Sequence, residues 1–254
     1  MFKYFRLIKD LFLINPGLFW KTLFWGLLIS WVGWNYLLKR PFYQVLYGTP
    51  THEKLQIWDK DSFIEIPEQK IIPLNIGGYD IEVQAIKRFE TTARVIYVDR
   101  YTKLGTWYRS HEGAALYDAV VPQDISLATG VVGRKHHCFK FTHGYRYGGG
   151  FSKYKCGKRW WEDFPNYSDD ISNNHSIAAS PNVQRGLDIL KQGDIVHIEG
   201  YLMYWNGTGN LRYQRFESAI VPNQMSEQLL GGQKAGLCRQ LLITKITFDG
   251  YTFE

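Results

Sequence analysis

The feature that most constrains this chain is an uncharged, strongly apolar run close to its N-terminus. Residues 22–38 read TLFWGLLISWVGWNYLL and contain no charged side chain. With the apolar residues 18–20 added, the run is about 21 residues long, and roughly 20 residues of helix cross the hydrocarbon core of a bilayer. Lys21 can extend its amine to the headgroups, and aromatic residues near both ends suit the interface. We predict a transmembrane helix over 18–38.

Two other structures could explain such a run. A cleaved signal peptide has a shorter apolar region followed by small residues at the cleavage site, whereas Lys39, Arg40 and Pro41 follow here. A buried helix of a soluble protein has one apolar face, whereas this run carries Trp and Phe on all faces. The pattern therefore favours an anchor that stays in the chain.

The charges beside the run predict its direction. Residues 1–17 alternate apolar and basic side chains, which indicates an amphipathic segment on the cytoplasmic membrane surface. Four basic residues precede the core of the span and two follow it, so the positive-inside rule places the N-terminus in the cytoplasm. We expect a single-pass protein of a bacterial inner membrane, with a connector at 39–60 and a periplasmic domain at 61–254.

The location of the positive charge argues against a general affinity for nucleic acid. The chain has a net charge of +6. Residues 1–40 contribute +5 of it, from six basic residues and Asp10, and the rest of the chain contributes +1. Basic residues beside a membrane span serve the lipid surface, so a nucleic-acid partner would need a local site.

Residues 61–254 have the pattern of a β-rich domain. Runs rich in Ile, Val, Tyr and Thr between Gly, Pro and Asp predict strands at 62–66, 70–76, 79–85, 93–101, 115–123, 125–132, 195–205, 211–219 and 237–248. Ser180 and Pro181 are suited to begin one helix. In the segment 193–203, Gly200 would let a strand bend at the corner of a small barrel of the OB or SH3 type. The expected class is mainly β (α+β): a barrel or sandwich with one packed helix.

His175 is the one candidate catalytic residue. It lies in the sequence Asn-Asn-His-Ser just ahead of the expected helix. A histidine there could act as a general acid or base, or it could fix a loop by hydrogen bonds. A Ser or Cys nucleophile motif does not stand close to it in the sequence, although triad partners can be remote.

The cysteines and neighbouring histidines could form a disulfide or a metal site. Cys138 and Cys156 flank a glycine-rich stretch, and a bridge between them would stabilise an extracytoplasmic loop by about 3 kcal/mol. His136, His137, His143 and the two cysteines have suitable chemistry for zinc, but their spacing matches no zinc signature. We therefore expect a disulfide, and neither a metal nor another cofactor.

The stretch 134–159 combines basic and aromatic residues and contains no acidic ones. This combination suits anionic lipid, an acidic glycan, an acidic protein or single-stranded nucleic acid, and nucleic acid is the least expected outside the cytoplasm. A solvated hairpin without a ligand is the other interpretation. The candidate binding residues are Arg134, Lys135, Lys140, Tyr145, Arg146, Tyr147, Lys153, Lys155, Lys158 and Arg159.

The C-terminal two-thirds resembles a family of uncharacterised bacterial proteins that are often membrane-anchored or exported. Its pattern is P-x-D-x-x-L, N-x-H-x-I-P-A, G-D-x-V-x-x-x-G-x-L and a final Gly-x-Cys-Glu. The matching residues are 122–127, 173–179, 193–202 and 236–239, with Ala178 in place of the proline and Arg239 in place of the glutamate. The resemblance implies an envelope setting and no particular activity.

These observations lead to three hypotheses. The first is a bitopic inner-membrane protein whose periplasmic domain binds a protein partner, or a second copy of itself, in an envelope assembly without catalysis. The second is an envelope hydrolase that uses His175. The third is a nucleic-acid or nucleotide sensor facing the cytoplasm, which requires the opposite topology and reduced cysteines.

Overall fold

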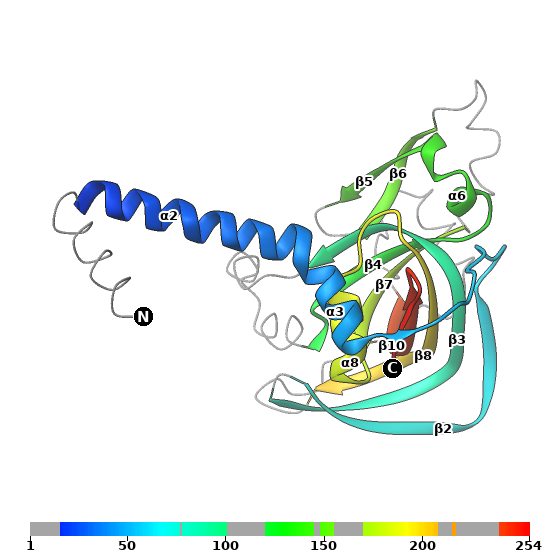
Figure 1. Ribbon diagram of the computed structural model, residues 1–254. Helices are drawn as coiled ribbons and strands as arrows, with labels where there is room; N and C mark the ends of the chain where they lie inside the picture. Colours follow the sequence, from blue (N-terminus) through cyan, green and yellow to red (C-terminus); the bar gives the residue numbers. More distant parts are fainter. Residues whose placement is uncertain are drawn as a thin grey trace. The chain divides into compact units, whose positions relative to one another are not determined.

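The computed structural model in Figure 1 describes residues 16–76, 78–100, 120–144, 148–154, 170–207, 215–216 and 239–254. The chain divides into two compact units, 1–46 and 47–254. The predicted segment 1–17 lies almost entirely outside the described residues.

Three helical elements follow one another at the N-terminal end of the described chain. They are α2 (Pro16–Val32), a π-helical turn (Gly33–Leu38) and α3 (Lys39–Tyr47). The apolar side chains of the first two are strongly exposed, from 39% for Trp34 to 71% for Leu37. Among the described residues, none of the helices combines the length and the apolarity that crossing a bilayer requires.

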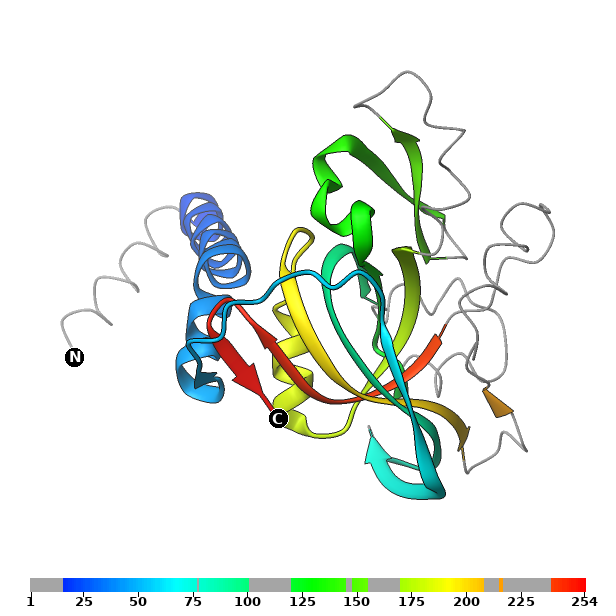
Figure 2. The ribbon, with the colours of Figure 1, turned by 90° about the vertical axis from the view of Figure 1, so that its right-hand side faces the viewer.

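The second unit is built around a closed ring of five strands. In ring order these are β3 (Tyr79–Arg100), β4 (Gln123–Ala128), β7 (Ile171–Ala178), β10 (Arg239–Phe248) and β8 (Ile195–Gly207), and β8 pairs again with β3. Among these five strands, β7 and β10 form the one parallel pair. In chain order the third and fourth of these strands are β7 and β8, and a helix connects them. This is the arrangement of the OB fold, a five-stranded Greek-key barrel. Figure 2 shows the strands wrapping around one interior.

The remaining elements extend or cover this ring. Strand β2 (Ser62–Ile76) pairs with β3, β9 (Arg215–Phe216) pairs with β8, and β11 (Tyr251–Phe253) joins β10 to β1 (Thr49–Pro50). Between β4 and β7 come α6 (Gly130–Arg134), a 3₁₀ turn (His136–Cys138) and a separate two-stranded sheet of β5 (Phe139–Gly144) and β6 (Gly148–Tyr154). In Figure 1 this hairpin and α8 (Pro181–Asp188) lie at opposite ends of the barrel.

The barrel corner depends on a glycine. A Cβ at Gly200 would lie 2.0 Å from the carbonyl oxygen of Leu242 on the neighbouring strand. The ladder between β8 and β10 shifts register just beyond, between Ile243 and Lys245. A glycine permits close approach of two backbones at a bend, so the predicted role of Gly200 is confirmed.

Helix α8 forms as its sequence predicts. The hydroxyl of Ser180 accepts a hydrogen bond from the Val183 amide at 3.1 Å, and Pro181 occupies the first turn. Val183 and Leu187 on one face are fully buried, and Gly186 lies against Phe253 of β11. The helix therefore covers the barrel with the apolar face expected from its spacing.

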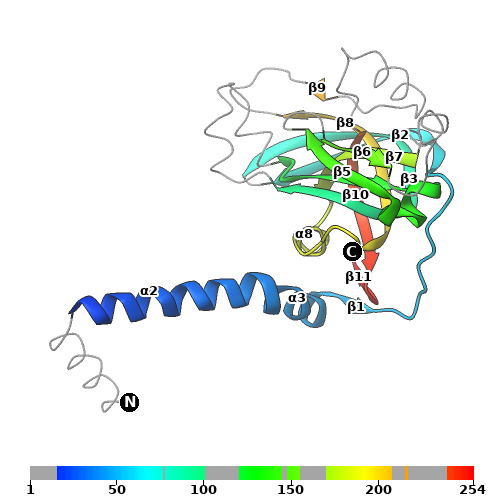
Figure 3. The same ribbon diagram turned by 90° about the horizontal axis from the view of Figure 1, so that it is seen from above.

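The segment between α3 and β2 is held to the barrel at several points. The Thr51 amide donates to the Gly250 carbonyl, and the Trp58 amide donates to the Thr92 carbonyl, both at 2.8 Å. The Trp58 carbonyl in turn accepts from Gly130 of α6 at 2.8 Å. We call residues 48–61 the strap; Figure 3 shows it leaving α3 and running to β2.

The expected fold class is confirmed at the level of a mainly β domain with a few helices. The structure adds one strand and corrects one predicted element. Residues 173–177, to which the sequence assigns no element, lie in a barrel strand whose backbone pairs with both β4 and β10. Residues 130–134 form the short helix α6 rather than a strand end, and Gly130 begins it with a positive φ of 51°.

Candidate functional site: a polar row on the barrel wall

The barrel places four polar residues in one row across four adjacent strands. Asp99 of β3 is paired with Asp124 of β4, Asp124 with His175 of β7, and His175 with Gln240 of β10. Side chains alternate between the two faces of a strand. The neighbouring residues Ile125 and Leu241 point into the barrel, so this polar row lies on the outer face of the same strands. His175 has these neighbours because residues 171–178 form a strand that pairs with both β4 and β10.

The centre of the polar row is a hydrogen bond between His175 and Asp124. The Nδ1 atom of His175 bonds the Oδ1 atom of Asp124. The two side chains are 17% and 7% exposed, respectively. A carboxylate on Nδ1 fixes the ring orientation and the tautomer, which leaves Nε2 as the nitrogen able to accept or donate a proton elsewhere.

A second polar row runs beside the first. Tyr97 of β3 is paired with Ser126 of β4, and Ser126 with Asn173 of β7. The Ser126 hydroxyl donates to the Asn173 side-chain oxygen at 2.9 Å. Burial, followed by the nearby Asp99 carboxylate, raises the pKa of the Tyr97 phenol, so Tyr97 keeps its proton and remains a hydrogen-bond donor at neutral pH.

All seven residues of the two rows take part in further interactions beyond those named above. Ser126 and Asn173 are almost fully buried, whereas Tyr97 and Asp99 keep partial exposure. Chemically, the face combines carboxylates, amides, hydroxyls and an oriented imidazole. Such groups form directed hydrogen bonds to a polar partner, and the oriented histidine could also transfer a proton.

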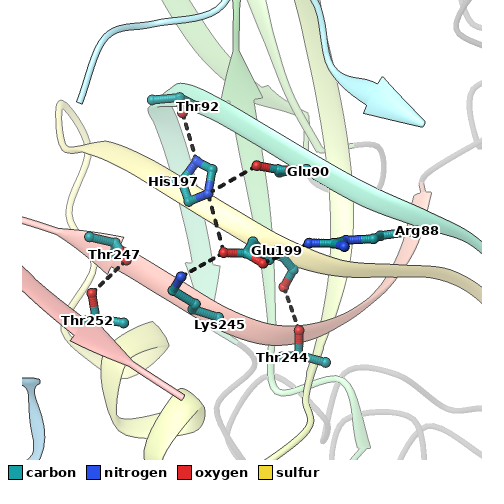
Figure 4. A network of polar contacts seen from close by, with 9 residues as sticks. All are labelled: Arg88, Glu90, Thr92, His197, Glu199, Thr244, Lys245, Thr247 and Thr252. Atoms are coloured by element: carbon teal, nitrogen blue, oxygen red, sulfur yellow. Dashed lines mark hydrogen bonds and ion pairs between the residues drawn. The ribbon is translucent and has the colours of Figure 1, made fainter. Parts of the chain in front are cut away.

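A second polar network surrounds His197 on another part of the wall, as Figure 4 shows. The Nδ1 atom of His197 lies 2.9 Å from the Thr92 hydroxyl, and its Nε2 atom lies 3.6 Å from both Glu90 and Glu199. The ring of Trp58 meets His197 edge-on with centroids 5.7 Å apart. The strap therefore covers this histidine, which is 7% exposed.

Glu199 connects this network to the neighbouring strands. It bonds Lys245 of β10 at 2.7 Å and Arg88 of β3 at 3.2 Å. Burial alone would raise the pKa of Glu199, but the hydrogen bond and charge of Lys245 outweigh it and lower the pKa. The same hydrogen bond raises the pKa of Lys245. The network binds three strands together, which is a structural role.

The predicted basic segment is only partly within the described residues. Arg134 pairs with Asp59 of the strap at 2.7 Å, and Lys135 is exposed. Lys140 and Lys153 take directly opposite register positions in the β5–β6 hairpin. The other predicted binding residues, Tyr145, Arg146, Tyr147, Lys155, Lys158 and Arg159, lie outside the described part of the chain.

The structure describes one of the two cysteines of the predicted disulfide. Cys138 is buried and disulfide-bonded. Cys156 and Cys238 both lie outside the described residues, so the pairing of Cys138 with Cys156 stays a prediction. Within the described ranges, the His, Cys, Asp and Glu side chains form no group of three suited to hold a metal ion.

Sequence reasoning found His175 but missed its partner. Asp124 lies 51 positions away, and only the strand pairing of β4 with β7 brings the two together. His197 was also missed as a site, because it lies in the segment 193–203 whose pattern was interpreted as fold alone. Its alternation with Val196 and Ile198 could have placed it on the outer wall.

Comparisons of the chain with protein-family models, with curated proteins and with solved structures gave no match. The resemblance noted from the sequence motifs stays a prediction.

Proposed function

We propose that the protein is a membrane-anchored binding module that recognises a protein partner in a bacterial envelope assembly and performs no catalysis. In this proposal residues 18–38 hold the chain in the inner membrane with the N-terminus in the cytoplasm. The OB-type barrel then faces the periplasm and binds its partner on the wall that carries the polar row.

The proposed membrane anchor is supported by the exposure of large apolar side chains around α2 and the π-helical turn. Monomeric soluble proteins rarely expose a contiguous apolar surface beyond a few hundred Å². Here the exposed side chains include four tryptophans and several leucines: Trp20, Leu23, Phe24, Trp25, Leu27, Ile29, Trp31, Val32, Trp34, Leu37 and Leu38. The proposal treats α2 and the turn as one helical anchor, since they follow each other without a break.

The position of the polar row supports binding at the barrel wall. OB folds bind their ligands on the face of the second and third barrel strands, together with the adjoining loops. The corresponding strands here are β4 and β7. His175 of β7 keeps partial exposure, as do Tyr97 and Asp99 of the neighbouring β3, whereas Asp124, Ser126 and Asn173 are buried. This is an argument by analogy of fold, and the chemistry of these residues adds to it. Two carboxylates, Asp99 and Asp124, make the face better suited to a polar or cationic partner than to a polyanion such as nucleic acid.

The contacts of the two histidines favour a role without catalysis. His197 is held by Thr92 and covered by Trp58. His175 is bonded to Asp124 across a strand pair, and both belong to a continuous hydrogen-bonded wall. Buried polar networks of this kind can serve to fix one arrangement of strands.

Membrane extraction tests the anchor. We expect the full chain to remain with membranes after washing at high salt and at alkaline pH, and to be released only by detergent. A variant with Leu27→Asp, Ile29→Asp and Trp31→Asp should move to the soluble fraction, because each charge at the centre of a span costs about 3 kcal/mol. Extraction of the unmodified chain by alkali would exclude an integral anchor.

Topology is tested by reporters fused to the C-terminus of the full chain. We expect alkaline phosphatase activity, which requires the periplasm, and no fluorescence from a reporter that folds only in the cytoplasm. The reverse pattern would reverse the topology and would favour the third hypothesis, the cytoplasmic sensor.

Site-specific crosslinking tests the binding face. A photo-reactive amino acid at Tyr97 or Asp99, which are partly exposed, should give a discrete crosslinked product in living cells. The same group at Gln192, an exposed residue between α8 and β8, is the matched control. Equal products from all three positions would contradict a partner site on this wall.

The Asp124–His175 pair favours one alternative, a hydrolase. A buried carboxylate that orients a histidine is the arrangement that general-base catalysis uses. In that case His175 would accept a proton through Nε2, and Asp124 would hold the ring. Nitrophenyl esters and fluorogenic glycosides can serve as probes of hydrolysis. Turnover that is lost in His175→Ala and Asp124→Ala but kept in His197→Ala would support the hydrolase over the binding module.

A further inference from the structure

Helix α3 exposes a continuous row of apolar side chains. The members of this row, which we call the α3 apolar face, are Leu38, Phe42, Val45 and Leu46, and all four are exposed. They follow one another at intervals of four, three and one residues, so they share an arc of about 100° on the helix. The side chains across the helix from this arc are half-buried or, at Gln44, buried.

The burial pattern of α3 is the reverse of the pattern that water favours. Val45 is 72% exposed, whereas the adjacent Gln44 is 6% exposed. A surface helix of a soluble protein turns its apolar face to the core and its polar face to water. Helix α8 follows this rule, since Val183 and Leu187 are fully buried. The α3 apolar face therefore needs an apolar partner outside the helix itself.

The position of α3 in the chain points to the bilayer as this partner. The helix follows α2 and the π-helical turn without a break, and these two elements carry the apolar side chains of the proposed anchor. They are 17 and 6 residues long, together 23. At about 1.5 Å per residue this length reaches roughly 30–35 Å, enough for a hydrocarbon core of about 30 Å. Helix α3 then begins where the span ends, at the level of the headgroups.

The side chains around the start of α3 are of the kind found at a membrane interface. The Lys39 ammonium lies over the ring of Tyr43, 5.3 Å from its centroid. The ring of Trp34 meets that of Phe42 edge-on, with centroids 5.1 Å apart. Aromatic rings and lysines concentrate at the headgroup level. A π-helical turn is also a common point for a helix to change direction, and Figure 1 shows α3 turning away from the axis of α2 beyond it.

We propose that α3 is an interfacial helix whose apolar face enters the boundary between the headgroups and the acyl chains of the bilayer that holds the anchor. This inference rests on the proposed membrane anchor. Helices of this type bury their apolar face about 5–10 Å into that boundary. Gly48 alone separates Tyr47, the last residue of α3, from β1, and β1 pairs with β11. The contact therefore holds the beginning of the barrel unit at the membrane surface.

The test is depth-dependent fluorescence quenching of the full chain in vesicles of phosphatidylethanolamine and phosphatidylglycerol. A fluorescent amino acid is placed at Val45, at Ile29 of α2 or at Glu53 of the strap, which are all exposed. Nitroxide lipids carry the quencher either near the headgroup or near the bilayer centre, and iodide quenches from water. We expect the shallow nitroxide to quench Val45 most and the deep nitroxide to quench Ile29 most. Iodide should quench Glu53 about fivefold more strongly than Val45, because the boundary excludes it.

A double variant shows whether the apolar side chains hold α3 at this depth. With the fluorescent amino acid at Leu46, Phe42→Ser together with Val45→Ser should reduce quenching by the shallow nitroxide about threefold, because apolar area is lost. Serine has about the same helix propensity as phenylalanine and valine, so the change acts on the apolar face rather than on helix formation. Ile71→Ser, at an exposed residue of β2, is the matched control and should leave the quenching unchanged. Undiminished quenching in the double variant would contradict the proposal.

The three positions distinguish failure of the interfacial helix from failure of the anchor. If iodide quenches Val45 as strongly as Glu53 while the deep nitroxide still quenches Ile29, the interfacial helix is overturned and the anchor stands. Protection of Val45 from iodide without quenching by either nitroxide overturns it as well, because protein, such as a second copy of the chain, then covers the face. Equal quenching of Val45 and Ile29 by the deep nitroxide places α3 in the hydrocarbon core instead. Absence of lipid quenching at Ile29 overturns the anchor and the interfacial helix together.

Discussion

The guanidinium of Arg239 pairs with the carboxylate of Asp61 although 178 positions separate them in the chain. The side chains are only 4% and 8% exposed. The Thr91 hydroxyl donates to the other oxygen of Asp61 at 2.6 Å, and the rings of Phe63 and Phe89 lie over the guanidinium. The pair therefore fastens the end of the strap to the first residue of β10.

Breaking this pair should be costly. Asp61→Ala leaves the Arg239 charge buried without a partner, which typically destabilises a fold by about 3–5 kcal/mol. The free energy of unfolding, measured by urea denaturation, should fall by this amount. Replacing both residues, as in Asp61→Leu with Arg239→Met, should restore much of the loss because the unpaired charge is gone. A double variant as unstable as Asp61→Ala would show that the charge is not the cause.

Gly200→Ala should destabilise the barrel by about 3 kcal/mol. The added Cβ would lie 2.0 Å from the Leu242 carbonyl oxygen and 3.1 Å from the Cα of Ile243, and backbone atoms within two paired strands cannot move aside. Gly78→Ala is the matched control. Gly78 has a φ of 84° and open space around it, so it loses only the 1–2 kcal/mol typical of left-handed strain. Equal losses in thermal denaturation would contradict the steric explanation.

The sequence predicts elements with strong local signals better than it predicts their pairing. Ser180, Pro181 and the spacing of Val183 and Leu187 identify α8, because capping and periodicity act within a few residues. The glycine at position 200 indicates the barrel corner for the same reason. Both predictions depend on chemistry that is local in the chain.

The candidate site depends on register, which local patterns do not determine. The alternation of polar and apolar residues in 171–178 is weak, since Asn174 and Ser176 face the interior and are fully buried. A strand with buried polar residues on its inner face does not show the period-two pattern of a half-buried strand. The sequence therefore does not predict a strand here, and the partnership of His175 with Asp124 cannot be inferred from it.

Glu199 should make stability depend on acidity. Burial raises its pKa in the folded protein, but the hydrogen bond from Lys245 and nearby positive charge outweigh burial, and the pKa is lowered. A carboxyl whose folded pKa lies below its unfolded value, about 4.3, adds stability that is fully present above that value. This stability is lost as the pH falls through the folded pKa.

Glu199→Gln measures this contribution. At pH 7 the variant should be less stable than the unmodified protein by about 2 kcal/mol, the range of hydrogen bonds to charged groups. As the pH falls below about 4 the difference should shrink toward zero, because the unmodified carboxyl is then becoming protonated as well. Glu65→Gln is the control. The Glu65 side chain is 78% exposed and forms an ion pair with Lys87, so its replacement should change stability little at any pH. A constant difference across the range would contradict the assignment.

Ser180→Ala tests the cap of α8. The substitution removes the acceptor of the Val183 amide, and loss of such a cap costs about 1 kcal/mol. Ser180→Asp keeps an acceptor at the same position and should retain most of the stability. If the alanine and aspartate variants unfold at the same urea concentration, the hydroxyl does not act as a cap.

Trp58→Ala tests whether the strap stabilises the barrel wall. The change removes the ring that packs on His197, and it weakens the positioning of two backbone hydrogen bonds, to Thr92 and from Gly130. We expect a loss of about 2–3 kcal/mol, below the range for a fully buried tryptophan because Trp58 is partly exposed. Hydrogen exchange should accelerate at the amide of Gly130 and along α6, since that amide bonds the Trp58 carbonyl. Gln56→Ala, an exposed neighbour in the strap, should leave both measurements unchanged. Unaltered exchange at Gly130 in Trp58→Ala would mean that the backbone bonds hold the strap without the ring.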